Sequence, residues 1–285
     1  MAHGVLAEIQ TLDPEKDFER IGYLSAAFDF PWDVEQSLSL AFFKTYGIPA
    51  ISELLDRTGE FRNRAQKRYD DTKLILAEIF ENGLDGERSQ EAFRRMNRMH
   101  GRFPISNDDL LYVLSTFVLV PLRWNRAYGW RPYSAQEEKS QLEYWRAMAK
   151  RMNIKGVPAS VGELDRWSRD YERANLRFSE SSRRVADDTL GLFLSWYPRP
   201  LRPLIRLAVF ALLEERLLDA FGYPHPPAWF RSLLEVALKL RARVVALLPR
   251  RTRPRLVTQE KHRAYPGGYR LEQLGVEGLE PAGRG

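Results

Sequence analysis

Four histidines occur among the 285 residues, and His100 is the one whose surroundings suit a metal ligand. It shares one face of a predicted helix with three apolar residues at steps of three and four, namely Phe93, Met96 and Phe103. An imidazole that projects from an apolar stripe can coordinate a metal, and Gly101 lets a flat ligand approach the backbone. The alternative is a hydrogen-bonded core histidine, the commoner role for a single histidine on an apolar face.

A second group of residues with possible chemistry lies on an earlier predicted helix. Four charged residues recur there at steps of four, three and four, on one face beside an apolar stripe: Glu60, Arg64, Lys67 and Asp71. Together with Arg68, the two cations Arg64 and Lys67 could face a cavity and hold an anionic group or oxygen bound at a metal. The alternative is a solvated surface of salt bridges, each worth roughly a few tenths of a kcal/mol.

Residues that the sequence lacks exclude several kinds of chemistry. The absence of cysteine excludes disulfides, iron–sulfur clusters, thiolate-bound haem, c-type haem and a cysteine nucleophile. No glycine-rich phosphate loop, His-Glu-x-x-His or Gly-x-Ser-x-Gly motif occurs. A di-iron bundle needs Glu-x-x-His pairs, but the residues three places before the last three histidines are Asn97, Gly222 and Gln259.

The charge balance is mildly basic, with a formal net charge of +6. Such an excess favours membrane surfaces, nucleic acids or acidic substrates. We expect no nucleic-acid partner, because acidic residues are interspersed among the arginines and no helix-turn-helix or zinc pattern appears. The N-terminal segment lacks the order of a signal peptide, and no apolar run approaches about 18 residues. These features predict a cytoplasmic protein without a transmembrane helix; nothing indicates its oligomeric state.

The elements that position these residues are predicted to be helices throughout, because the apolar spacing is helical and no series of alternating strands appears. Helices are expected over 32–47, 49–59, 60–81, 89–103, 110–120, 135–152, 161–178, 182–197, 203–221 and 228–248. Ser106 suits an N-cap before an acidic first turn. Pro121 should kink or end the helix that it follows. The fold class is therefore all-α, with one domain over residues 1–266 and an irregular tail over 267–285.

The last predicted helix and the arginines after it form a basic amphipathic element over residues 228–255. One stripe of this helix is apolar: Leu233, Ala237, Leu240, Val244 and Leu247. Basic residues lie elsewhere on the helix, and four more arginines follow it. This pattern fits an element that lies on an anionic membrane surface. It also fits an ordinary domain helix with a solvated basic face.

Nine short segments, in a common order, resemble the MpaB-type oxygenases, whose catalytic domain is shared with the bacterial rubber oxygenases called latex clearing proteins. The likeness runs from about residue 12 to residue 275. The segments are FPWD at 30–33, FKTYGIP at 43–49, TGEF at 58–61, RAQKRYDDT at 64–72, RMNRMH at 95–100, ISNDDLLY at 105–112, PLRW at 121–124, WRP at 130–132 and YPGGY at 265–269.

The resemblance implies an all-helical domain with a globin-like core around one b-type haem. His100 matches the proximal iron ligand, and its Nδ1–H should find a hydrogen-bond partner that orients the ring. Arg64 and Lys67 match a distal Arg-x-x-Lys segment, but Arg68 replaces the threonine that follows it in rubber oxygenases. A distal carboxylate acts there as a base, and Glu60 is the first candidate for it.

Glu53 is the second candidate for that base. Arg95 and Arg98, or their neighbour Arg94, could pair with the haem propionates. The implied reaction is oxidative cleavage of a carbon–carbon double bond in an isoprenoid or other lipophilic substrate, with dioxygen as co-substrate. The alternative is a helical protein that binds haem or lipid without catalysing a reaction.

Overall fold

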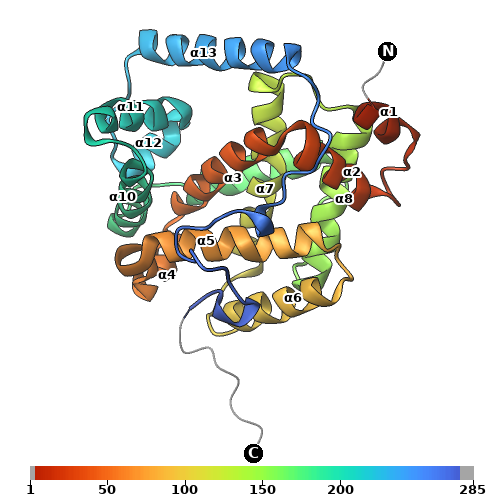
Figure 1. Cartoon of the computed structure of the whole chain (residues 1–285). Coiled ribbons are helices and arrows are strands. Elements are labelled where there is room, and N and C mark those ends of the chain that lie inside the picture. The colour runs from red at the N-terminus through yellow and green to blue at the C-terminus, as the bar shows by residue number, and fades with distance from the viewer. Residues whose placement is uncertain (1–3, 277–285) are drawn as a thin grey trace, which may run out of the picture.

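The computed structural model describes residues 4–276, and this part of the chain has no β-strand beyond one isolated bridge between His262 and Tyr265. Figure 1 shows the helices of this part of the chain. They are α1 (Gly4–Thr11), α2 (Phe18–Leu24), α3 (Pro31–Tyr46), α4 (Pro49–Thr58), α5 (Glu60–Glu81), α6 (Glu87–His100), α7 (Asn107–Tyr128), α8 (Ala135–Arg151), α9 (Val161–Asn175), α10 (Glu180–Ser195), α11 (Arg202–Leu212), α12 (Glu215–Phe221) and α13 (Ala228–Leu247). The predicted all-α fold is confirmed.

Four short elements complete the described chain. A π-helical turn, η1 (Ser25–Asp29), continues α2, and three 3-10 turns follow later: η2 (Arg199–Leu201), η3 (Val257–Gln259) and η4 (Leu271–Gln273). None of the helices between residues 4 and 276 is long and apolar enough to cross a bilayer.

Helices α3 and α7 form the centre of the fold, and they pack on each other more extensively than any other pair in the described chain. Helices α5 and α8 flank them, and α6 packs against α5 at the end of the molecule opposite α13 (Figure 1). One apolar core lies among α3, α5, α6, α7 and α8, and a second lies between α3, α5 and α10–α12.

Helix boundaries follow the predicted local signals. The hydroxyl of Ser106 accepts a hydrogen bond of 3.0 Å from the backbone N–H of Asp109, as an N-cap should. Pro31 and Pro49 begin α3 and α4, where their missing N–H groups cost no helical hydrogen bond. Gly59 separates α4 from α5 with a φ of 69°, a conformation that glycine adopts without a Cβ clash.

Helix α7 departs from the prediction, because it continues through Pro121 as far as Tyr128. A proline leaves the carbonyl four residues earlier without its helical partner. Here that carbonyl belongs to Phe117, and the side-chain amide of Gln141 on α8 donates to it at 3.2 Å. The neighbouring helix α8 thus supplies a hydrogen bond to the carbonyl that Pro121 leaves free. The prediction that the helix could end at Pro121 is therefore wrong.

The predicted single helix over 203–221 is also wrong, because Leu213 adopts an extended conformation and divides it into α11 and α12. Glu214 at this break forms an ion pair of 2.7 Å with the buried Lys44 on α3. Arg231 on α13 donates to the carbonyls of Ala211 and Leu213, which lie at the end of α11. Contacts between distant segments therefore stabilise a break that no local signal predicts.

The two ends of the described chain also differ from the prediction. Helices α1 and α2 were not expected, and Ile9 and Ile21 bury their side chains there. Residues 267–276 belong to the expected irregular tail and contain only one 3-10 turn, but Leu271 and Leu274 are buried in the main core. The folded domain therefore extends beyond residue 266, and the rest of the predicted tail lies outside the described residues.

Candidate functional site

His100 is the last residue of α6, and it lines a cavity of about 320 Å³. The cavity lies among α3–α8, and its walls are mainly aliphatic and aromatic side chains. Met96 and Phe103 also line it, so most of the face predicted from the spacing around His100 is the face that meets the cavity. A pocket of this kind suits a lipophilic ligand or cofactor.

The imidazole of His100 is held neutral by its surroundings. Burial, with a further contribution from the positive charge of Arg68, lowers the pKa of His100 to about 4. Its Nδ1 atom is buried and has no hydrogen-bond partner within residues 4–276, which contradicts the expected partner for this atom. A buried polar atom without a partner is costly in a folded protein, and a functional role of the side chain is one explanation for it.

Two arginines line this cavity: Arg57, which is exposed, and Arg68, which lies one residue after the predicted Lys67 on α5. The guanidinium of Arg68 lies 5.5 Å from the centre of the Phe61 ring and donates a hydrogen bond to Thr72. In the described part of the chain, no carboxylate lies within ion-pair distance of Arg68. An incompletely neutralised guanidinium beside apolar walls can stabilise negative charge there.

Glu60 also borders the cavity, at the start of α5, and only 4% of its surface is exposed. Arg64 donates two hydrogen bonds to its carboxylate, at 3.2 and 2.5 Å, across a break in the helical conformation at Arg64 itself. The alternative base, Glu53, is exposed on α4 and does not line the cavity. The structure therefore favours Glu60 over Glu53 as a carboxylate that could reach a ligand.

Lys67 does not line the cavity and instead binds the C-terminal segment. Its ammonium forms an ion pair of 2.7 Å with the buried Asp71 and donates to the carbonyls of Gln273 and Gly275. The expectation that Lys67 faces the cavity is thus not met. Arg68, noted beside it in the sequence, takes that position instead.

The arginines predicted to hold propionates lie outside the cavity walls. Arg95 donates a hydrogen bond to the backbone carbonyl of Leu274, and Arg98 is exposed. Arg94 is paired with Glu91 on the same helix. These three side chains therefore point to the C-terminal segment or to solvent.

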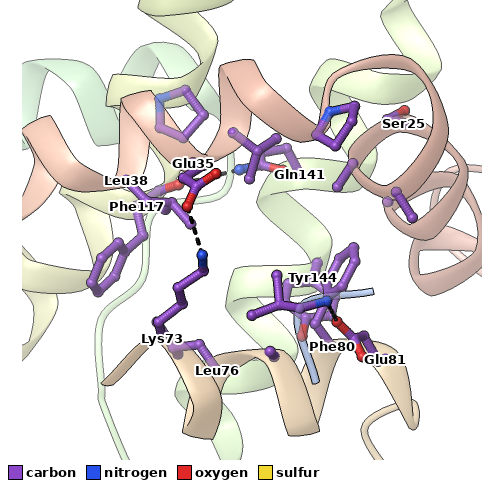
Figure 2. Close-up of a pocket in the computed structure, with 18 of the residues that line it drawn as sticks. Ser25, Glu35, Leu38, Lys73, Leu76, Phe80, Glu81, Phe117, Gln141 and Tyr144 are labelled. Carbon is purple, nitrogen blue, oxygen red and sulfur yellow. Dashed lines mark hydrogen bonds and ion pairs between the residues drawn. The ribbon is translucent and has the colours of Figure 1, made fainter. Parts of the chain in front are cut away.

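A second, smaller cavity of about 170 Å³ lies between α3, α5, α8 and the π-helical turn η1 (Figure 2). Its walls are largely apolar, and Gly22, Ala26 and Ala27 leave space along one side. Lys73 reaches across from α5 and forms an ion pair of 2.6 Å with Glu35 on α3, as Figure 2 shows. Spacing in the sequence did not reveal this cavity, because its walls come from segments far apart in the chain.

Six residues line both cavities and form a shared wall between them: Phe42, Tyr69, Leu76, Phe117, Trp145 and Met148. The rings of Phe117 and Trp145 stack with their centres 5.1 Å apart, and Phe42 meets Phe117 edge to face at 5.6 Å. The two cavities are therefore adjacent, and these six residues lie between them.

The donor set suits a cofactor that needs one protein ligand. Residues 4–276 contain no group of three or more histidine, aspartate or glutamate side chains that could hold a metal ion. The neutral imidazole of His100 borders an apolar space, which fits the single histidine ligand of a b-type haem, although the Nδ1 atom lacks the hydrogen bond expected to orient the ring. The residues present are thus compatible with haem.

Comparison with known proteins shows the family of this chain. Residues 46–265 match the family described as "ER-bound oxygenase mpaB/B'/Rubber oxygenase, catalytic domain". The chain is 30% identical over 231 residues to "ER-bound oxygenase mpaB'" of Penicillium brevicompactum, a match that covers 73% of this chain and 55% of that relative. It is 28% identical over 217 residues to "ER-bound oxygenase mpaB" of Penicillium roqueforti (strain FM164), which covers 70% of this chain and 73% of the relative.

A third relative is "ER-bound oxygenase mpaB" of Penicillium brevicompactum, 30% identical over 188 residues. That match covers 60% of this chain and 48% of the relative, so the chain spans about half the length of two of the three relatives. The family match alone extends over more than half of the chain and includes α4–α13. This chain therefore belongs to the mpaB and rubber oxygenase family.

Proposed function

We propose that this protein is a haem-dependent oxygenase that cleaves a carbon–carbon double bond in an isoprenoid or a similar lipophilic alkene. The main support is the half-buried imidazole of His100, whose Nδ1 atom is buried without a partner and which borders an apolar cavity. Membership of an oxygenase family supports the same reaction class. The globin-like haem pocket that the resemblance implies would be this cavity.

His100 would hold the haem iron, since its low pKa keeps the ring neutral and able to coordinate at physiological pH. Bound haem would supply the activation of dioxygen. Addition of both oxygen atoms across the double bond yields two carbonyl products, so the balance needs no outside reductant.

Two charged side chains would act on the substrate side of the cavity. Arg68 would stabilise negative charge as it develops, because a fixed guanidinium in an apolar space needs little reorganisation. The carboxylate of Glu60 would take an allylic proton from the alkene and return it to the product. Arg64, bonded to both oxygens of Glu60, would orient that carboxylate.

The second cavity would accommodate the rest of a long apolar substrate. Its walls are largely apolar and it shares six residues with the His100 cavity, so a chain could extend from one space into the other past Phe117. Such an arrangement favours an elongated alkene over a compact one. Burial of each additional methylene of the chain would contribute about 0.8 kcal/mol.

The experiment that tests this function starts with the absorption spectrum of protein produced with ample iron and haem precursor. We expect a Soret band, oxygen consumption with farnesol or a related prenyl alkene, and carbonyl products. His100→Ala should lose the Soret band and the activity together, whereas Arg94→Ala, on the exposed side of α6, should keep both. A His100→Ala variant with full haem content would refute the ligand assignment. Haem binding without turnover of any alkene would instead indicate a carrier.

A further inference from the structure

Helix α13 exposes a continuous stripe of large apolar side chains. Its members recur at helical spacing along one face: Trp229, Leu233, Val236, Leu240, Val244 and Leu247. Each of these six side chains is between 50% and 87% exposed. A row of this kind is unusual on the surface of a soluble monomer, where exposed apolar residues are mostly scattered, and it marks an interaction surface.

The opposite face of α13 is anchored to the domain, so the stripe is fixed outward. Phe230 and Ala242 are buried. Arg241 forms an ion pair of 2.8 Å with Asp33 on α3, and its guanidinium stacks 3.8 Å from the centre of the Trp32 ring. Within residues 4–276 these contacts leave the apolar stripe exposed along the outer edge of the molecule, where Figure 1 shows α13 at the end opposite α6.

The charge of this segment is strongly positive. Residues 228–255 contain eight arginines and lysines and one acidic residue, Glu235. Lys239 pairs with Glu235 on the same helix. Arg243, Arg251 and Arg253 are exposed, and no carboxylate in the described part of the chain lies within ion-pair distance of them. Unneutralised arginines therefore accompany the exposed apolar stripe.

We propose that α13 and the arginines that follow it form a docking surface for an anionic phospholipid bilayer. The helix would lie in the plane of the interface, with the leucine and valine side chains in the acyl region and the arginines at the headgroups. Trp229 is the residue type that prefers the boundary between these two regions. A second copy of this chain fits less well, because it would bring unneutralised arginines against each other instead of against anionic headgroups.

The position of α13 links this surface to the second cavity. Asp33, which holds Arg241, lies between Pro31 and Val34 on α3, and both of these residues line that cavity. A lipophilic ligand dissolved in the bilayer would thus lie close to the apolar interior. Membrane binding itself does not depend on what the cavities hold.

Flotation of the full chain with vesicles tests this docking surface directly. We expect the protein to float with vesicles of phosphatidylcholine and phosphatidylglycerol, to bind pure phosphatidylcholine more weakly, and to lose most of the difference at high salt. The variant Leu233→Glu/Leu240→Glu should bind at least about tenfold more weakly, because two charges then enter the apolar face. A variant Arg243→Gln/Arg251→Gln/Arg253→Gln should lose the preference for anionic vesicles but keep part of the neutral binding.

The control is Phe178→Glu, which places one glutamate at an exposed apolar residue between α9 and α10, away from α13. This control should float like the unchanged protein, and circular dichroism should show the same helix content for every variant. Failure of the unchanged protein to bind anionic vesicles would overturn the proposal, as would full binding by the double glutamate variant. Sedimentation that shows a dimer, disrupted by Leu233→Glu/Leu240→Glu, would assign the stripe to a second copy and also overturn it.

Discussion

The ammonium of Lys67 donates a hydrogen bond of 2.8 Å to the backbone carbonyl of Gly275, and so joins α5 to the C-terminal segment. The same ammonium pairs with Asp71, which also accepts hydrogen bonds from the backbone N–H of Gly275 and from the hydroxyl of Tyr265. Lys67 thus lies at the centre of a small polar network that fastens residues 265–275 to the helix.

The first prediction is that Lys67→Met destabilises the fold by about 2 to 3 kcal/mol, because it leaves the buried Asp71 without its cation. Urea unfolding followed by circular dichroism measures this change. The control Lys139→Met removes an exposed ion pair with Glu15 and should change the free energy of unfolding by less than about 1 kcal/mol. Equal effects of the two variants would contradict the structural role of Lys67.

The difference between Lys67 and Arg68 shows what the sequence could and could not predict. Adjacent residues on a helix point about 100° apart, so only one of the two can face the cavity. The resemblance to the rubber oxygenases indicated α5 as the element that carries a cation on the side of the pocket opposite His100. In the structure Arg68 faces the cavity, and Lys67 donates to carbonyls of the C-terminal segment about two hundred positions away, which local spacing cannot report.

The helix boundaries, too, were predictable from sequence only where local signals determine them. Local signals such as the Ser106 cap and Pro49 predicted where α7 and α4 begin, because caps act over one turn. The passage of α7 through Pro121 depends on Gln141, and the break at Glu214 depends on Lys44. Gln141 and Lys44 are distant in sequence from the residues that they contact, and the periodicity of the chain does not predict these contacts.

The second prediction concerns pH. Glu137 and Arg131 form a buried ion pair of 2.7 Å. Burial alone would raise the pKa of Glu137, but hydrogen bonds and charge from Arg131, with further hydrogen bonds from Ser134 and Ser25, outweigh it and lower the pKa below its ordinary value of 4.5. A lowered pKa in the folded state stabilises the protein above pH 4.5, and this stabilisation is lost as the pH falls through the folded-state pKa.

Glu137→Gln should therefore cost about 3 kcal/mol at neutral pH, and the difference from the unchanged protein should shrink as the pH drops below the ordinary glutamate value. Denaturant unfolding at a series of pH values provides the measurement. The neighbouring Glu138→Gln breaks only an exposed pair of 3.4 Å with Arg126 and should have little effect at any pH. A constant difference for Glu137→Gln across the acid range would show that its charge is not what stabilises the fold.

The third prediction tests the second cavity as the site of the substrate chain. Ala27 is buried and lines this cavity but not the His100 cavity, so Ala27→Phe would fill part of the second space. We expect the affinity for geranylgeraniol to fall at least about tenfold, because several methylenes lose their buried environment, while geraniol binds as before. Calorimetric titration measures both affinities, and an unchanged Soret band controls for the haem site. A parallel loss for both alcohols would count against a chain-length role.

The fourth prediction compares the effects of Arg68 and Lys67 on the affinity for an anion that binds to haem. Arg68 lies in the His100 cavity without a carboxylate partner in the described chain, whereas Lys67 is turned to the C-terminal segment. Arg68→Leu should weaken the affinity of the haem-loaded protein for azide by about tenfold or more, since a cation in an apolar space stabilises an anion strongly. Lys67→Met should leave it nearly unchanged, and Arg68→Lys should restore part of it. Azide titration followed by the absorption spectrum distinguishes these outcomes. A larger loss of azide affinity in Lys67→Met than in Arg68→Leu would show that Lys67, and not Arg68, stabilises the bound anion.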